Sequence, residues 1–363
     1  MLSREDNELL TRIGPGTAMG ALFRRHWLPF MLADELVADA PPKRLKLLGE
    51  CLVAFRDSQG RAGLLGEHCP HRRASLALGR NEAGGLRCAY HGWKFDVAGR
   101  CLDMPSEPAG SGFRDRVRAE AYRVTERAGI LWAYLGPAEK RAELPELEWL
   151  GVPAAQRHAS RQVQVCNYAQ VLEHEIDESR AGLAAIEDRG PRYTVHETPY
   201  GLACGTRRQA DGDRHLWRVS LFLMPCFTLV PPAGDPPARL FRAWVPQDDE
   251  HTSILSVTWR TDAPPGERQL EEWKSAGVAH RELAESAGPV ADRTREHLGT
   301  SDKAVIAFRQ RVIHAARQLA QGIEPQAPYD PDCYRVRAHC ALAPRDERDF
   351  IEQEAIRREM LAP

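Results

Sequence analysis

The chain has 363 residues, with 49 basic and 51 acidic side chains and a formal net charge of −2. Nucleic-acid-binding domains usually carry a basic excess, so this balance argues against a nucleic-acid partner. Hydrophobic residues make up 43% and charged residues 28%, as in ordinary globular proteins, and the length predicts about two domains. Nine cysteines, an odd number in a chain of this size, argue against a disulfide scaffold.

The ends and apolar runs of the sequence predict no membrane partner. The N-terminal sequence MLSREDNELL lacks the basic and apolar pattern of a signal peptide. The longest apolar stretch, residues 221–230, covers about half a bilayer span and is interrupted by Pro225. We therefore expect a cytoplasmic protein with reduced thiols.

The first part of the chain is predicted to be rich in β-strands. Short apolar runs, such as residues 45–55 and 129–135, are separated by glycine turns. Short strands at this spacing favour an antiparallel sandwich. The Pro/Gly-rich stretch at residues 136–153 marks the predicted domain boundary.

The remainder of the chain mixes helical and strand-like segments. Residues 167–186 have a helical composition, and residues 193–260 contain further strand-like runs. Residues 269–322 are rich in the helix formers Ala, Glu, Arg and Leu. The predicted fold class is therefore α+β, with an all-β domain over residues 1–150 that begins with a helical segment, and a mixed domain over residues 151–363.

Two short segments each combine one cysteine with one histidine. Cys69-Pro70-His71 and Cys88-Ala89-Tyr90-His91 are separated by sixteen residues. A zinc site could use these four side chains, but zinc fingers usually pair Cys with Cys and His with His. One ligand of each kind per segment suits a Rieske [2Fe–2S] cluster, in which two thiolates hold one iron and two imidazoles hold the other. Cys69, His71, Cys88 and His91 are therefore the candidate ligands.

The flanking residues carry a resemblance to a known family. The motifs that resemble it are Cys69-Pro70-His71-Arg72, Tyr90-His91-Gly92-Trp93-Lys94-Phe95, Trp132-Ala133-Tyr134-Leu135-Gly136, Asn167-Tyr168-Ala169-Gln170 and Trp244-Val245-Pro246. The sequence resembles the oxygenase component of Rieske non-haem iron oxygenases, in the branch of phthalate dioxygenases and demethylases. The resemblance implies that residues 151–363 form a helix-grip domain, an antiparallel sheet with long helices.

The same resemblance implies a second metal site, at which this sequence departs from the family. Members hold a mononuclear Fe(II) with two histidines and one carboxylate, leaving positions open for O₂. The histidines lie three and eight residues after an Asp that matches Asp177, where this chain has Arg180 and Ala185. The third ligand, an Asp in the family, aligns with His280. Since all three positions are altered, we expect that this chain does not bind the mononuclear iron.

Arg180 is the most informative of these changes. A guanidinium stays protonated and is not an ordinary metal ligand. We hypothesise that Arg180 supplies the positive charge of the missing metal, pairing with Asp177 and neutralising Glu173 and Glu175. The alternative is that Arg180 faces solvent.

A relocated metal site is the other possibility at this place. His174 and Glu178 lie four residues apart, on one face of a predicted helix, and His280 could add a third ligand. The alternative is that His174 and Glu178 form a solvated surface pair. That interpretation is the more ordinary one for a lone helical histidine.

The resemblance implies ring-shaped trimers, in which an electron passes from the cluster of one subunit to the iron of the next by way of the Asp that matches Asp177. The main hypothesis is an electron-transfer subunit that works with an iron-competent homologue in a trimer or hexamer. Because no phosphate loop or dinucleotide fingerprint is present, flavin and NAD(P)H would belong to a separate flavin and iron–sulfur reductase. Two alternatives remain: a self-sufficient oxygenase or demethylase for a small aromatic substrate with a relocated metal, and a redox-sensing or scaffold subunit.

Overall fold

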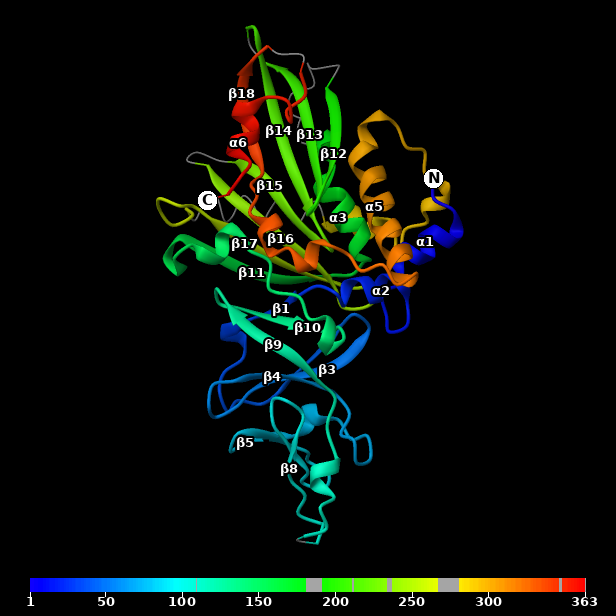
Figure 1. Ribbon diagram of the computed structural model, residues 1–363, viewed down its shortest axis with the longest axis vertical. Helices are drawn as coiled ribbons and strands as arrows, with labels where there is room; N and C mark the ends of the chain where they lie inside the picture. The colour runs from blue at the N-terminus through cyan, green and yellow to red at the C-terminus, as the bar shows by residue number, and fades with distance from the viewer. Residues whose placement is uncertain are drawn as a thin grey trace.

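Two antiparallel sheets form the N-terminal part of the protein in the computed structural model, which describes residues 1–108, 110–180, 191–210, 212–233, 237–266, 281–345 and 348–362. The larger sheet has the strand order β1-β10-β9-β4-β3-β2, and the smaller has β5-β6-β7-β8. The larger sheet consists of β1 (Leu28–Leu32), β2 (Lys43–Leu47), β3 (Glu50–Arg56), β4 (Ala62–Gly66), β9 (Ala121–Arg127) and β10 (Ile130–Tyr134). The smaller sheet consists of β5 (Arg80–Glu82), β6 (Gly85–Arg87), β7 (Lys94–Phe95) and β8 (Cys101–Asp103), and it lies at the lower end of the molecule (Figure 1).

The run at residues 45–55 forms a hairpin rather than one strand. Its turn residues, Leu48 and Gly49, have φ angles of 49° and 78°. Their backbone N–H groups donate to the carbonyls of Pro246 (3.0 Å) and Gln247 (2.8 Å). The turn is therefore fixed by a contact with a distant segment, which the local sequence pattern does not reveal.

An eight-stranded antiparallel sheet forms the C-terminal part. Its order is β11-β17-β16-β15-β14-β13-β12, with β18 added alongside β14. The strands are β11 (Arg157–Gln164), β12 (Arg192–Thr198), β13 (Gly201–Ala210), β14 (Arg214–Leu223), β15 (Phe227–Ala233), β16 (Ala238–Pro246), β17 (Thr252–Trp259) and β18 (His339–Pro344). The helices are α1 (Arg4–Thr11), α2 (Ala18–Phe23), α3 (Tyr168–Ile176), α5 (Lys303–Ala320) and α6 (Glu354–Glu359).

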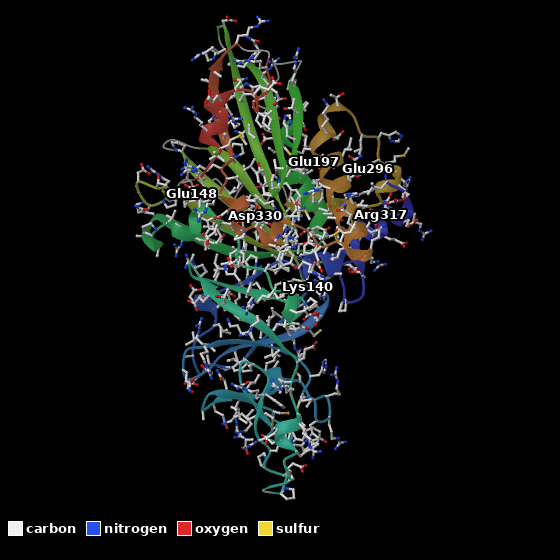
Figure 2. All side chains as sticks on the ribbon, viewed as in Figure 1. Lys140, Glu148, Glu197, Glu296, Arg317 and Asp330 are labelled. Carbon is white, nitrogen blue, oxygen red and sulfur yellow. The ribbon has the colours of Figure 1, made fainter. Side chains whose placement is uncertain are left out.

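The N-terminal helices pack with the C-terminal helices rather than with the strands that follow them. Helices α1 and α2 lie beside α5 at the right of Figure 1, and α3 contacts α5 as well. Arg317 of α5, which is labelled in Figure 2, forms an ion pair with Asp6 of α1 at 2.5 Å. The chain therefore begins on the C-terminal part before it enters the first sheet.

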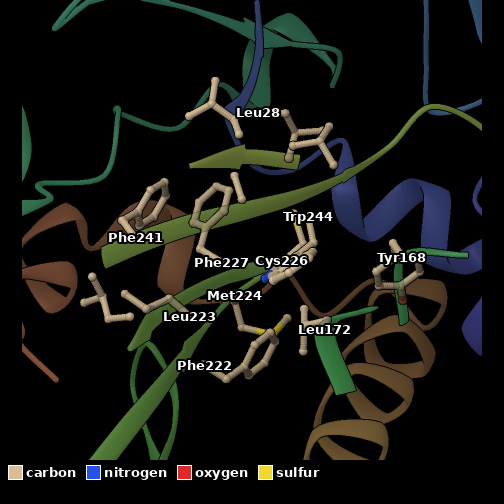
Figure 3. Close-up of a cluster of buried hydrophobic side chains, with 14 of the residues drawn as sticks. Leu28, Tyr168, Leu172, Phe222, Leu223, Met224, Cys226, Phe227, Phe241 and Trp244 are labelled. Carbon is tan, nitrogen blue, oxygen red and sulfur yellow. The ribbon is translucent and has the colours of Figure 1, made fainter. Parts of the chain in front are cut away.

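A continuous aromatic core joins the two parts. Trp132 of β10 stacks at 6.1 Å from Trp149, which lies 5.2 Å from Phe241 of β16. Phe227 and Phe241 pack below Leu28 of β1 in Figure 3. Because buried aromatic side chains contribute strongly to packing, these contacts help to hold the two parts together.

The sequence of elements confirms the predicted fold class, an all-β region followed by an α+β region. A second, smaller core lies under the β5–β8 sheet and includes Cys69, Cys88, Trp93 and Phe95. Among the described residues, none of the helices combines the length and the apolar character that crossing a bilayer would require.

Candidate metal centre

The first ligand loop is closed by two backbone hydrogen bonds. The N–H of Cys69 donates to the carbonyl of Ala74 at 2.8 Å, and the N–H of Arg73 donates back to the carbonyl of Cys69 at 3.0 Å. Arg73 adopts a left-handed conformation, with φ at 60°. The loop therefore turns sharply between Cys69 and Ala74.

The second ligand loop repeats this conformation. The N–H of Cys88 donates to the carbonyl of Trp93 at 2.8 Å, and the N–H of Gly92 donates to the carbonyl of Cys88 at 3.1 Å. Gly92, four residues after its cysteine like Arg73, is also left-handed, with φ at 74°. Glycine adopts this conformation without steric cost. The two loops are thus matched turns that face one another.

The four candidate ligands meet in two pairs. The thiols of Cys69 and Cys88 are buried and lie beside each other. The rings of His71 and His91 lie edge to face, with centroids 4.5 Å apart. The structure therefore brings together all four residues that the sequence singled out, as a sulfur pair and a nitrogen pair.

The electrostatics of the pairs suit metal ligation. Burial, with the neighbouring Cys88, raises the pKa of Cys69 to about 11, so a thiolate there requires a nearby cation. Partial burial lowers the pKa of His91, and the nearby charges of His71 and Arg72 lower it further. The lowered pKa favours the neutral imidazole that binds metals. Within the described part of the chain, Nδ1 of His71 is a buried nitrogen without a hydrogen-bond partner. Such an unsatisfied atom fits a metal ligand.

The pairwise arrangement matches the ligand requirement of a binuclear cluster. Over the described ranges, no group of three or more His, Cys, Asp or Glu side chains could hold one metal ion. Structural zinc requires four ligands around one centre. A [2Fe–2S] cluster requires only two protein ligands for each iron, and the thiol and imidazole pairs match that requirement.

Aromatic rings and arginines surround the imidazole pair. His71 stacks on Trp93 at 4.3 Å, with the ring planes 10° apart. Tyr90, which is 57% exposed, packs at 3.7 Å on His91 and carries the guanidinium of Arg72 at 5.6 Å.

A second exposed ring lies on the Trp93 side. Phe113 contacts Trp93 at 6.0 Å, and the guanidinium of Arg116 lies 5.6 Å from the Phe113 ring. Two arginine-capped rings, Tyr90 with Arg72 and Phe113 with Arg116, therefore flank the imidazoles.

The second candidate site, around α3, is dominated by ion pairs. Glu173 is buried and accepts hydrogen bonds from Arg293 (3.0 Å) and Arg309 (2.8 Å). Burial alone would raise the pKa of Glu173, but Arg293 and Arg309 hold this pKa below its usual range. Glu296 also binds Arg309, so two carboxylates balance two guanidiniums.

The next carboxylates along the chain have partners of their own. Glu175 is bound by Arg242 of β16. Glu178, in the 3-10 turn after α3, accepts from Arg218 Nε at 2.9 Å and from the Ser220 hydroxyl.

Asp177 is held by a contact within its own turn. It caps the turn, and its Oδ1 accepts from the N–H of Ser179 at 3.0 Å. The carboxylate between Glu175 and Glu178 is therefore also engaged.

Two expectations for this segment need revision. The predicted surface pair of His174 and Glu178 is wrong for Glu178, which is buried because β14 supplies its partners Arg218 and Ser220. Glu173 and Glu175, which Arg180 was expected to neutralise, are held by other arginines from distant strands and helices.

The three altered iron positions are not described in full. The side chain of Arg180 lies outside the described residues, as do Ala185 and His280. The altered triad, the pairing of Arg180 with Asp177 and the relocated metal site therefore remain predictions.

Sequence reasoning missed the arginines Arg218, Arg242, Arg293 and Arg309. They lie between 40 and 136 residues from their carboxylates, so no local spacing indicates the pairing. The equivalence of Arg73 and Gly92, by contrast, could have been found by aligning the two segments on their cysteines.

Comparison with known proteins agrees with this geometry. Residues 26–122 match the family described as the Rieske [2Fe-2S] domain, and residues 274–359 match the family described as LigXa C-terminal domain like. The 3-chlorobenzoate-3,4-dioxygenase oxygenase subunit of Comamonas testosteroni is 34% identical over 92% of this chain and 93% of its own length. The phthalate 4,5-dioxygenase oxygenase subunit of Pseudomonas putida is 32% identical over 89% and 88%.

This chain is also similar to a demethylase subunit and to a solved monooxygenase structure. The 5,5'-dehydrodivanillate O-demethylase oxygenase subunit of Sphingobium is 34% identical over 90% of this chain and 83% of its own length. Dicamba monooxygenase bound to 3,6-dichlorosalicylic acid has a TM-score of 0.63 at 18% identity, covering 83% of this chain and 99% of that one. The fold is thus that of Rieske oxygenases, and the chain belongs to this family as an oxygenase component with a Rieske [2Fe–2S] domain.

Proposed function

We propose that this chain is an electron-transfer subunit of a Rieske oxygenase. It would accept electrons from a separate reductase into a [2Fe–2S] cluster held by Cys69, Cys88, His71 and His91, and pass them to an iron-competent homologous subunit in the same trimer or hexamer. The cluster, when bound, supplies one-electron chemistry. The chain's own residues would hold it, shield its thiolate side and present its imidazole side to partners.

The observation that carries the proposal is the pairing of the carboxylates around α3. Glu173, Glu175 and Glu178 are each engaged by at least one guanidinium, and a cation would have to displace an arginine to bind them. Breaking a buried ion pair costs about 3–5 kcal/mol, so such a segment disfavours a metal. Two expected iron ligands are also replaced in the sequence, by Arg180 and Ala185.

The exposed imidazole side supports electron exchange with another protein. Tyr90 and Phe113 present apolar ring faces, and Arg72 and Arg116 add positive charge beside them. Aromatic residues and arginine are the side chains that most often dominate binding at protein interfaces. We infer that a partner with acidic side chains docks over these rings, close to His71 and His91.

Asp177 is proposed as a bridge for electrons between subunits. Its carboxylate is only partly buried and ends α3, with one oxygen fixed by the N–H of Ser179. Asp177→Asn retains an oxygen for this hydrogen bond and removes the charge. We expect slower transfer in a mixed assembly with unchanged cluster content, and an unchanged rate would remove Asp177 from the path.

A rescue experiment tests the proposal. An iron-competent homologue whose own cluster ligands have been replaced cannot deliver electrons to its iron. Co-assembled with this chain and a reductase, it should regain turnover. Its matched control is the same assembly with Cys88→Ser in this chain, which should stay inactive. Absence of rescue, or turnover by this chain without a homologue, would contradict the proposal.

A further inference from the structure

The guanidinium of Arg87 lies against the second ligand loop. Arg87 ends β6, directly before Cys88, and its side chain is 18% exposed. Its Nη1 donates to the carbonyl of Gly92 at 2.5 Å and to Asp103 Oδ2 at 2.8 Å. Its Nε donates to Glu82 Oε1 at 2.5 Å. One planar group therefore ties the loop to strands β5 and β8 at once.

The contact with Gly92 falls at the residue that follows His91. Among the described residues, two backbone hydrogen bonds close this loop, one between Cys88 and Trp93 and one between Gly92 and Cys88. A bond from a charged donor is roughly twice as strong as a neutral one. The Arg87 contact therefore restrains the backbone directly after His91.

The first ligand loop has no equivalent contact to its own turn within the described residues. Its nearest ion pair joins Glu67 to Arg44 at 2.6 Å, and Glu67 accepts from Ser75 at 2.6 Å. Arg44 is 58% exposed, and this network touches the residues on either side of the loop rather than a carbonyl beside the ligand. Within the described residues, the loop that carries His91 is therefore restrained by a side chain beside its histidine, and the loop that carries His71 is not.

We propose that Arg87 is a positioning residue that fixes the orientation of His91 on the cluster. This inference rests on the proposed function, because it requires the [2Fe–2S] cluster. The guanidinium also offsets the charges of Glu82 and Asp103. Loss of that positive charge beside a cluster lowers its reduction potential, since local charge and hydrogen bonding tune iron–sulfur centres.

Two substitutions separate position from charge. Arg87→Lys keeps the charge but lacks the planar fork that reaches Gly92, Glu82 and Asp103 in one geometry. Arg87→Gln removes the charge as well. The matched control is Arg80→Gln, because Arg80 lies 3.7 Å from the same Glu82 and is 78% exposed. The readouts are the midpoint potential, the histidine nitrogen couplings of the reduced cluster, and the rate of cluster loss.

For Arg87→Lys we expect changed histidine couplings and severalfold faster cluster loss at a potential close to that of the unmodified chain. For Arg87→Gln we expect the same changes with a lowered potential, while Arg80→Gln matches the unmodified chain. Should Arg87→Gln not fold, the variant that adds Glu82→Gln and Asp103→Asn removes the unbalanced carboxylates, and the same changes in couplings and cluster lifetime are expected.

Unmodified couplings and cluster lifetime in Arg87→Lys, or in the triple variant, would overturn the role of Arg87. If the unmodified chain itself shows no Rieske signal, the proposed function fails first. The two failures are therefore distinguishable in one set of measurements.

Discussion

The polar side chains of the ligand loops and those of the α3 segment have opposite kinds of partner. In the loops, Cys69 and Cys88 face each other, and His71 and His91 do the same. On α3 and the turn that follows it, the carboxylates are each taken up by an arginine or a backbone N–H.

The comparison shows what separates a metal-ready site from a structural one. A metal site needs donors that have no other partner, inside a shell whose own charges are satisfied. The second loop meets this condition, since Arg87 pairs with Glu82 and Asp103 outside the ligands. Around α3 the guanidiniums occupy the carboxylates directly, and a buried pair of this kind resists replacement by a cation.

The largest expected effect is on the ligand loops. Cys88→Ser should abolish the cluster, because a serine hydroxyl does not replace the thiolate that holds the iron. Iron analysis and visible circular dichroism check this result. Cys51→Ser is the control, since Cys51 is exposed on β3, and it should leave the cluster intact. A Cys88→Ser chain with normal cluster absorption would contradict the assigned ligands.

A large effect on stability is expected for the ion pairs around α3. Glu173→Leu leaves Arg293 and Arg309 buried without their shared carboxylate, and it should lower the free energy of unfolding by about 3–5 kcal/mol. Urea denaturation measures the change. Glu8→Gln, in an exposed pair with Arg4, should change it by less than about 0.5 kcal/mol. Equal effects of the two substitutions would show that the ion pairs of Glu173 with Arg293 and Arg309, the α3 network, do not stabilise the fold.

A pH effect of similar or smaller size is expected at His26, between α2 and β1. Burial lowers the pKa of His26 to about 4. The folded state therefore binds fewer protons than the unfolded state below the ordinary histidine pKa. The contribution of neutral His26 to the free energy of unfolding is complete above about pH 6.5. It is lost as the pH falls towards 4, a change of about 3 kcal/mol.

The variant His26→Gln isolates this contribution. It should flatten the dependence of the free energy of unfolding on pH in the window between about pH 4 and 6.5. Denaturation series at several pH values measure the slope. An unchanged slope would assign the acid sensitivity to other groups, among them Glu173, whose lowered pKa also favours the folded state at higher pH.

The smallest effect tests the similarity of the two loops. Arg73→Gly relieves a left-handed conformation that costs about 1–2 kcal/mol, partly offset by the flexibility of glycine, so a gain of up to about 1 kcal/mol is expected. Gly92→Ala should do the reverse, because its Cβ would lie 3.2 Å from Pro105 in a left-handed residue. Thermal unfolding checks both, and a loss of stability in Arg73→Gly would show that the loops are not equivalent.

The sequence predicted the grouping of the four Cys and His side chains because their spacing is local. Cys69 and His71 lie two residues apart and Cys88 and His91 three, so each pair is visible in a single short turn. The α3 network could not be predicted, because Glu173 and Arg293 are 120 residues apart and meet only after the helices pack. The hairpin within residues 45–55 was missed for the same reason, since Pro246 and Gln247 fix its turn.

We propose that this chain carries a [2Fe–2S] cluster and no mononuclear iron. The most direct test is the iron content of the purified Cys88→Ser variant beside that of the unmodified chain. We expect about two irons per unmodified chain and about none in the variant, because the cluster would be the sole iron site. About three irons in the unmodified chain, with one retained in Cys88→Ser, would contradict it.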